Sequence, residues 1–254
     1  MGEMNDKKPR SILHKLETYG AQQQRVPSSG RHILANFTED TVVVYQAFHQ
    51  EIARYAVERQ QFVGCPQYSM ERMTWFKTNF MWMMYRCGWC TKDANQARVL
   101  AIHLTREGFD AMLSMAVYSG SKGGHQNCEA ARGPRRNDPV RLQWDPDHSP
   151  SGGKKERRAI QLGIRGEAIQ MFHRDWIVLI EDITDELVIA QRDVALRTRD
   201  LEVESKSTEE AAVREGWANL EVPIEDIYVP RDTTLARRIG LTGFDDEEDD
   251  STDQ

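Results

Sequence analysis

The chain has 254 residues and a formal net charge of −7, with 33 Lys and Arg against 40 Asp and Glu. Seven of those acids follow Phe244, so the rest of the chain carries equal numbers of acidic and basic residues. This balance excludes a strongly basic nucleic-acid-binding protein and an acidic solvating protein, whereas 39% of hydrophobic residues suffices for one sizeable core.

The start of the chain and its cysteines bear on its location. Met1–Arg10 lacks the apolar stretch of a signal peptide, and the longest strongly apolar run, Phe80–Tyr85, is too short to span a bilayer. The four cysteines are too sparse for a disulfide framework, which is typical of a reducing compartment. We therefore expect a cytoplasmic protein with no membrane partner, and a nuclear location would fit the same features.

The first thirty residues predict a flexible leader. Gln22–Arg25 is a polar run, and Pro27–Gly30 is typical of a turn. We expect ordered structure from Arg31 onward, so a protein trimmed to residues 31–244 should melt like the full chain.

A strand, a helix and a buried helix are predicted in the next section. Thr41–Phe48 is β-branched and aromatic, and apolar residues from Ile52 onward recur at helical spacing. A short strand is expected over Arg72–Phe76. Phe80–Tyr85 is apolar on every side and predicts a helix that is buried, Trp82 included.

The middle of the chain predicts a strand at Arg98–Leu104, followed by a helix that Thr105 caps. Ser119–Asp138 holds four glycines without any period, so we expect a mobile insertion there. Pro139–Asp145 and Arg157–Ile164 then predict two strands that pair as a hairpin.

The last third predicts a helix face at Ile169, a buried strand at Ile177–Ile180, a charged helix at Thr184–Leu201 and an ordered piece at Val222–Val229. The acidic residues 245–254 should be disordered. Strands and helices without a regular alternation favour one α+β domain over residues 31–244, with a mixed or mainly antiparallel sheet and flanking helices.

Several strong catalytic motifs are absent from the sequence, including the dinucleotide-binding glycine pattern, the P-loop and the zinc-protease helix. Cys87-Gly88-Trp89-Cys90 has the spacing of a redox pair or of half a zinc site, but no second ligand pair accompanies it. We predict no metal site and interpret the pair as ordinary reduced thiols.

The densest functional pattern is an aromatic and basic block between Glu71 and Trp89. Its cations, Arg72, Lys77 and Arg86, have donors that suit phosphate groups, and Trp75 and Tyr85 offer faces on which a base can stack. This combination indicates a nucleotide site. The competing interpretation, which the residues alone favour, is a core helix with solvated cations at its rim.

The chain also resembles a known family, the uncharacterised domain of unknown function 4291. The similar blocks follow one another in order: Thr41–Ala47, Glu71–Trp75, Trp82–Arg86, Thr105–Phe109, Val140–Asp145 and Trp176–Asp182. The resemblance implies no catalytic residues, because none is established for the family. Leu34 stands where an arginine is expected, Cys87 and Cys90 replace small residues, and Ser119–Asp138 looks inserted.

A second resemblance concerns the layout of Val43–Phe48 and the helix after it, which is similar to the first strand and helix of the ADP-ribosyltransferase fold. That likeness implies NAD as cofactor, an Arg or His on the first strand and a glutamate on a late strand. Gln46 departs from the first requirement. Glu181 could meet the second as the catalytic carboxylate, or be a solvated acid at a strand end.

Our leading hypothesis is therefore a nucleotide-binding protein that acts as an ADP-ribosyltransferase-like enzyme, an NAD-using glycosyl or phosphoryl transferase. Glu181 is its expected catalytic residue, and its expected cofactor-binding residues are Arg72, Trp75, Lys77, Tyr85, Arg86 and Arg141. One alternative is a non-catalytic interaction protein that uses the charged helix and the acidic tail. The other is an RNA-binding protein that uses the basic cluster Lys154–Arg158.

Overall fold

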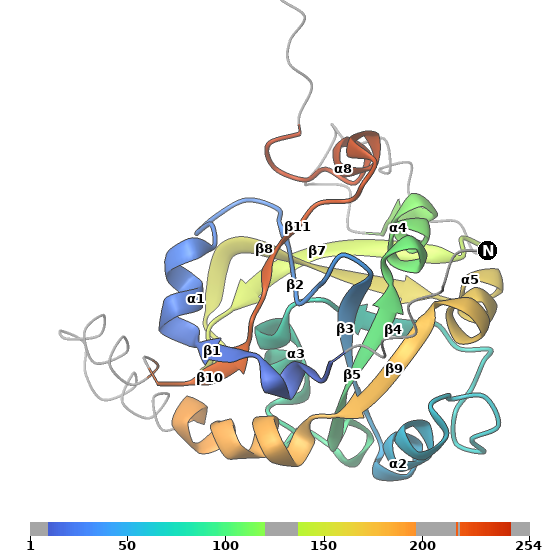
Figure 1. The fold of residues 1–254 in the computed structure, drawn as a ribbon, viewed down its shortest axis with the longest axis horizontal. Coiled ribbons are helices and arrows are strands. Elements are labelled where there is room, and N and C mark those ends of the chain that lie inside the picture. The colour runs from blue at the N-terminus through green and yellow to red at the C-terminus, as the bar shows by residue number, and fades with distance from the viewer. Residues whose placement is uncertain (1–9, 120–136, 197–216, 218, 245–254) are drawn as a thin grey trace, which may run out of the picture.

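The computed structural model describes residues 10–119, 137–196, 217 and 219–244 (Figure 1). The predicted acidic tail and most of the predicted insertion lie outside these residues. No helix in the described ranges has the length and apolar content needed to cross a bilayer.

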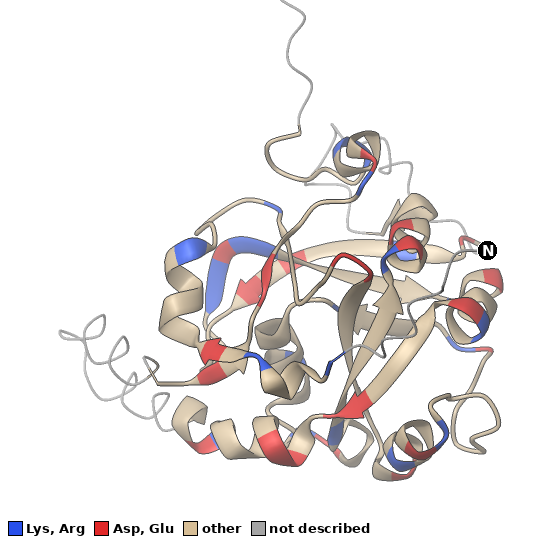
Figure 2. Cartoon of the chain, viewed as in Figure 1, with Lys and Arg blue, Asp and Glu red and all other residues tan. Residues whose placement is uncertain are grey.

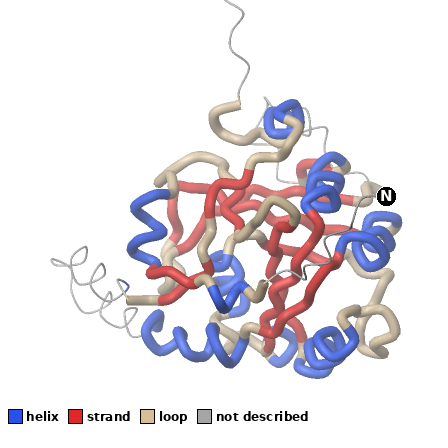
Figure 3. The backbone as a smooth tube through the Cα atoms, viewed as in Figure 1, coloured by secondary structure: helices blue, strands red, loops and turns tan. Residues whose placement is uncertain are grey.

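A seven-stranded mixed sheet forms the centre of the molecule, with helices around it (Figure 3), which confirms the predicted α+β class. The strand order is β6-β7-β8-β4-β3-β5-β9, and neighbours are antiparallel except β6 and β7. The strands are β3 (Thr41–Phe48), β4 (Thr74–Lys77), β5 (Arg98–Thr105), β6 (Ala116–Tyr118), β7 (Val140–His148), β8 (Lys154–Ile164) and β9 (Ile177–Asp182). The predicted hairpin is β7 and β8.

Each face of the sheet carries its own apolar core, because successive side chains of a strand point to opposite faces. Val42 and Val44 of β3 belong to one core, and Val43 and Tyr45 to the other. The first core includes residues of α2 (Gln50–Arg59), α4 (Arg106–Ser114), α5 (Glu167–Met171), the π-helical turn Phe172–Trp176 and α8 (Thr233–Arg238). The second includes residues of α3 (Phe80–Cys87), the 3-10 turn Ile12–His14, α1 (Tyr19–Arg25) and the π-helical turn Thr184–Ile189.

The local capping predictions agree with the structure. The Thr105 hydroxyl accepts a hydrogen bond from the Gly108 N–H at the start of α4.

Two other predicted features of helices can be compared with the structure. Trp82 is 6% exposed, so the buried position predicted for it is confirmed. The predicted helix at Thr184–Leu201 is described as far as residue 196 and starts with a π-helical turn.

Residues 10–30 differ from the predicted flexible leader. β1 (Leu16–Thr18) pairs with β10 (Glu221–Pro223), and α1 follows it with the Thr18 hydroxyl as its cap. Tyr19 is 4% exposed and meets Trp217 edge to face at 6.1 Å between ring centroids. The polar run misled the prediction because Gln22 is itself buried and donates to the Pro223 carbonyl at 2.9 Å. Ordering here depends on partners some 200 residues away in the sequence.

The C-terminal strands complete this arrangement. β11 (Asp226–Tyr228) pairs with β2 (Ile33–Ala35), as β10 pairs with β1. The ordered piece predicted at Val222–Val229 is therefore confirmed as two short strands, each paired with the N-terminal part of the chain.

A buried ion pair connects the β7–β8 hairpin to the N-terminal segment. Arg157 donates to Asp147 Oδ2 from Nη2 at 2.5 Å and from Nε at 3.0 Å, and the two side chains are only 3% and 1% exposed. Its Nη1 also donates to the Pro27 carbonyl at 2.6 Å. Figure 2 shows the basic residues at the start of β8 beside α1. Arg157, one of the four basic residues of the predicted RNA-binding cluster, is therefore buried and not available to bind RNA.

The outer edge of β9 is occupied by a side chain. Gln60 ends α2 in a left-handed conformation with φ of 54°. Its amide donates to the Ile180 carbonyl and accepts from the Ile180 N–H, both at 2.9 Å.

Candidate functional site

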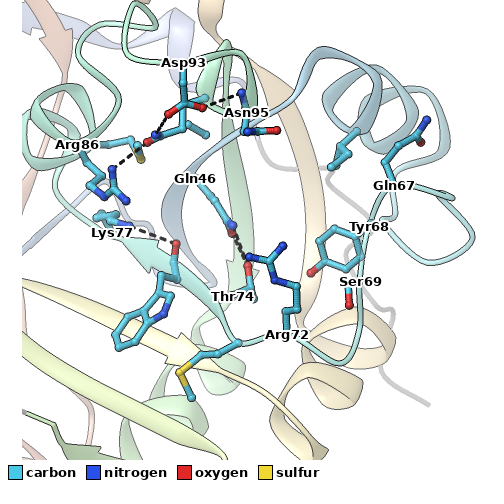
Figure 4. A pocket seen from close by; sticks show the side chains of 16 residues that line it. Gln46, Gln67, Tyr68, Ser69, Arg72, Thr74, Lys77, Arg86, Asp93 and Asn95 are labelled. Atoms are coloured by element: carbon cyan, nitrogen blue, oxygen red, sulfur yellow. Dashed lines mark hydrogen bonds between the residues drawn. The ribbon is translucent and has the colours of Figure 1, made fainter.

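A cavity opens where two central strands separate. β3 and β4 pair only at Tyr45 and Lys77, and beyond that pair a space of about 450 Å³ lies between the strands, α3 and two loops (Figure 4). Residues of β3, α2, the loop before β4, β4, α3 and the segment after α3 line this split-strand cavity: Gln46, Ala47, Ile52, Gln67, Tyr68, Ser69, Arg72, Met73, Thr74, Trp75, Lys77, Met83, Arg86, Asp93, Asn95 and Gln96.

Three cations face the cavity, and all three were predicted. Arg72 precedes β4, Lys77 ends it, and Arg86 lies in the last turn of α3. Within the described part of the chain, none of them forms an ion pair with a carboxylate. Arg86 donates to the Gln96 side chain at 3.3 Å. Asp93 lines the cavity too, but its hydrogen bonds go to the Asn95 N–H and the Gln96 amide. The three cations outnumber this lining carboxylate, which favours an anionic ligand.

Lys77 is the most enclosed of the three cations, at 5% exposure. Burial, and then the charge of Arg86, lower the pKa of Lys77 to about 8, although Asp145 opposes the shift. Its ammonium lies 5.3 Å from the Trp82 ring centroid and makes one long hydrogen bond, 3.4 Å, to the Trp75 carbonyl. Such a poorly solvated ammonium would gain from an added anion.

Trp75 packs closely against β8 because its register partner, position 163, is a glycine. A Cβ there would come within 2.8 Å of the indole ring and 2.9 Å of the Met73 sulfur. Tyr68 lines the same cavity, and its hydroxyl meets His173 Nε2 at 3.2 Å. The cavity thus has two aromatic residues beside its cations.

The sheet floor next to Lys77 is polar, which sequence reasoning missed. Lys77 lies in register with Gln161, whose amide nitrogen donates to Asp145 Oδ2 at 2.6 Å and to Gln143 Oε1 at 2.7 Å. Burial raises the pKa of Asp145 above its ordinary value. The alternation of polar residues along β7 and β8 could have predicted that Gln143, Asp145 and Gln161 share one face of the sheet. It does not show that β4, and with it Lys77, lies beside β8.

Capping fixes the position of α3 and therefore of Arg86. Asn79 Oδ1 accepts from the Trp82 N–H at 2.7 Å, and the buried Glu225 accepts from the Phe80 N–H, also at 2.7 Å. Gly88 ends the helix with φ of 58°.

Three predicted site residues lie outside the cavity lining. Tyr85 stacks on His148 at 3.5 Å between ring centroids. Arg141 is on β7, opposite Gly163 in the register. Glu181 is on β9, separated from Lys77 in the register by Tyr45 and Ala101, so the two Cα atoms are roughly 14 Å apart at about 4.8 Å a strand.

Glu181 has partners of its own. Its Oε2 is 2.6 Å from His103 Nε2 and accepts from the Ile12 N–H at 3.3 Å. Burial opposes its ionisation, but hydrogen bonds from His103 and Ser11 hold the pKa of Glu181 below its ordinary value. This carboxylate therefore anchors the start of the described chain, and the split-strand cavity brings together Arg72, Trp75, Lys77 and Arg86 without it.

Comparison with known proteins places these elements in one family. A model described as "Domain of unknown function (DUF4291)" matches residues 32–226, a range that contains every residue of the cavity. No curated protein matches the chain. Because the family model covers most of its length, the chain belongs to the DUF4291 family of domains of unknown function.

Proposed function

We propose that the protein binds a nucleotide in the split-strand cavity, with Arg72, Lys77 and Arg86 holding the phosphates. The observation that carries this proposal is the absence of any ion pair to these three cations among the described residues, although they share one cavity. Guanidinium and ammonium donors suit phosphate oxygens, and Trp75 and Tyr68 offer faces for a base.

NAD is the leading candidate ligand, and ADP-ribosyl transfer is the reaction we propose for it. The cavity of about 450 Å³ is within the usual range of small-molecule sites. Cleavage of a glycosidic bond develops positive charge on the ribose, which a nearby carboxylate stabilises. Asp93 is the carboxylate among the lining residues and is the one we propose for this role. Glu181 is held by His103 and Ile12, Asp145 is held by Gln161, and neither lines the cavity.

Thermal unfolding with a panel of NAD, ATP and phosphate-ended RNA tests the proposal. A ligand should raise the melting temperature by mass action, and Arg72→Met with Lys77→Met should abolish the shift while leaving the unliganded melt nearly unchanged. Arg54→Met with Arg174→Met is the matched control, since it removes two exposed cations elsewhere. If no ligand in the panel shifts the wild-type protein, the interaction-protein alternative replaces this proposal.

The affinity for a phosphate ligand should depend on pH through Lys77. Its pKa of about 8 means that the ammonium is charged below pH 8 and loses its proton above it. We expect the dissociation constant to rise between pH 7.5 and 9.5, by up to ~10-fold per pH unit above the pKa. Calorimetric titration would measure this, and Lys77→Arg should flatten the profile because arginine stays protonated. The same slope in Lys77→Arg would assign the titration to another group.

A further inference from the structure

Another cavity lies beside the first described residues of the chain, apart from the split-strand cavity. Its volume is about 290 Å³, and residues from the segments 10–15, 35–41 and 224–226 line it together with His103 of β5. The two cavities have no lining residue in common. We call this space the N-terminal cavity.

His103 is the buried polar residue in the wall of this cavity, with 2% exposure. Its Nε2 atom lies 2.6 Å from Glu181 Oε2, and an ionised carboxylate only accepts, so Nε2 is the donor there. The Nδ1 atom forms no hydrogen bond with the described residues, yet it is not among their fully buried unpartnered atoms. Nδ1 is therefore the ring nitrogen that a ligand in the cavity can reach.

Glu181 fixes the position of the histidine and of the chain segment next to it. Besides contacting His103, its Oε2 atom accepts from the Ile12 N–H at 3.3 Å, at the start of the 3-10 turn Ile12–His14. Arg10 and Lys15 flank this turn, and both line the cavity. One carboxylate thus holds a histidine ring and a cationic segment at the same cavity.

The charges in the wall of the N-terminal cavity favour an anionic ligand. Arg10 and Lys15 are exposed, and neither forms an ion pair with a carboxylate of the described residues. Asp226 lines the cavity too, but its Oδ1 atom accepts from Arg25 Nε at 2.7 Å. The two lining cations therefore outnumber a carboxylate that already has a cationic partner.

We propose that the N-terminal cavity is a second ligand site, which binds a phosphate group either free or in a small monoester. Nδ1 of His103 donates to a phosphate oxygen when the ring is charged, and accepts from a P–OH group when the ring is neutral. Hydrogen phosphate has both kinds of atom, whereas a carboxylate ion has acceptors only. Arg10 and Lys15 bind the remaining oxygens.

The size of the cavity limits the ligand. Sites for drug-sized molecules and cofactors usually measure roughly 300–1,000 Å³, so about 290 Å³ fits a small phosphate compound better than a nucleotide. The proposal is independent of the function proposed for the split-strand cavity, because the two spaces are lined by different residues.

Calorimetric titration of the full chain with inorganic phosphate and with glycerol phosphate tests the proposal. The titration uses Arg72→Met with Lys77→Met as its background, so that two cations of the split-strand cavity are absent. We expect saturable binding of at least one of the two compounds, and comparison of the two distinguishes free phosphate from a monoester. Adding Arg10→Met and Lys15→Met should weaken this binding by about 10-fold or more.

The matched control in the same background is Arg59→Met with Lys154→Met. It also removes one arginine and one lysine, both exposed and outside the two cavities, so the dissociation constant should not change.

His103→Gln separates a role in binding from a role in packing. The glutamine amide can keep a donor for Glu181, as Nε2 does, but it has no counterpart of Nδ1. We expect it to reduce phosphate affinity. Nitrogen NMR of the wild-type histidine side chains gives a second measurement that does not depend on how this variant folds. The Nδ1 resonance of His103 should shift as phosphate is added.

Three results would overturn the proposal. The first is no binding of either phosphate compound to the background protein. The second is binding that Arg10→Met with Lys15→Met leaves unchanged, and the third is a His103 Nδ1 resonance that stays in place at saturating phosphate. If the nucleotide panel fails while phosphate still binds here, the proposed function falls and this second site stands.

Discussion

Replacing Arg157 with methionine is expected to lower the free energy of unfolding by about 3–5 kcal/mol. Methionine fills much of the same space but leaves the Asp147 carboxylate, which is 1% exposed, without its cation in the interior. The change also removes the hydrogen bond from Arg157 to the Pro27 carbonyl. Urea unfolding of both proteins at one pH measures the difference.

Two controls separate the buried charge from the loss of an arginine. Asp147→Leu with Arg157→Met removes both charges and should recover most of the lost stability. Arg54→Met breaks an ion pair whose side chains are 66% and 57% exposed, so its effect should stay below about 1 kcal/mol. A similar loss in the double variant would mean that packing, and not the unpaired carboxylate, explains the effect.

Removing residues 1–30 should cost at least as much stability, contrary to what the sequence predicts for that segment. Ile12 and Tyr19 are 2% and 4% exposed in the second core, and burial of two such side chains contributes roughly 3–6 kcal/mol. The deletion also uncovers Trp217 and leaves β10 without its partner strand. Calorimetry of the trimmed and full chains should show a much lower and broader transition.

A point variant tests the same idea without trimming the chain. Tyr19→Ala should lower the free energy of unfolding by about 3–5 kcal/mol, whereas Gln24→Ala, at an exposed position of α1, should stay within about 0.5 kcal/mol. Equal melting of the trimmed and full chains would restore the flexible-leader prediction.

The contrast between α3 and α1 shows what the sequence alone could predict. Phe80–Tyr85 is apolar on every side, which predicts burial from composition alone. Phe80–Met84 are indeed buried, but Tyr85 is 45% exposed, so the prediction was wrong for the last residue of the run. Gln22 and Arg25 are polar, and their place in the structure depends on Pro223 and Asp226, far along the chain. Periodicity cannot report such long-range partners.

The site divides in the same way. Arg72, Trp75, Lys77 and Arg86 lie within fifteen positions of one another, so a single strand and the helix after it bring them to one cavity. The positions of Glu181 and Arg141 relative to the cavity depend on which strands are neighbours in the sheet. The residue pattern of a single strand does not predict the strand order of a mixed sheet. Asp145 and Gln161 could not be placed beside Lys77 for the same reason.

The Gln60 amide has a consequence for assembly. An unpaired strand edge invites another chain to add to the sheet, which can lead to strand exchange or fibre formation. Gln60 occupies both backbone groups of Ile180 at the middle of β9, so an incoming strand would first have to displace a bidentate amide. One side chain at the end of α2 thus blocks extension of the sheet at the middle of this edge.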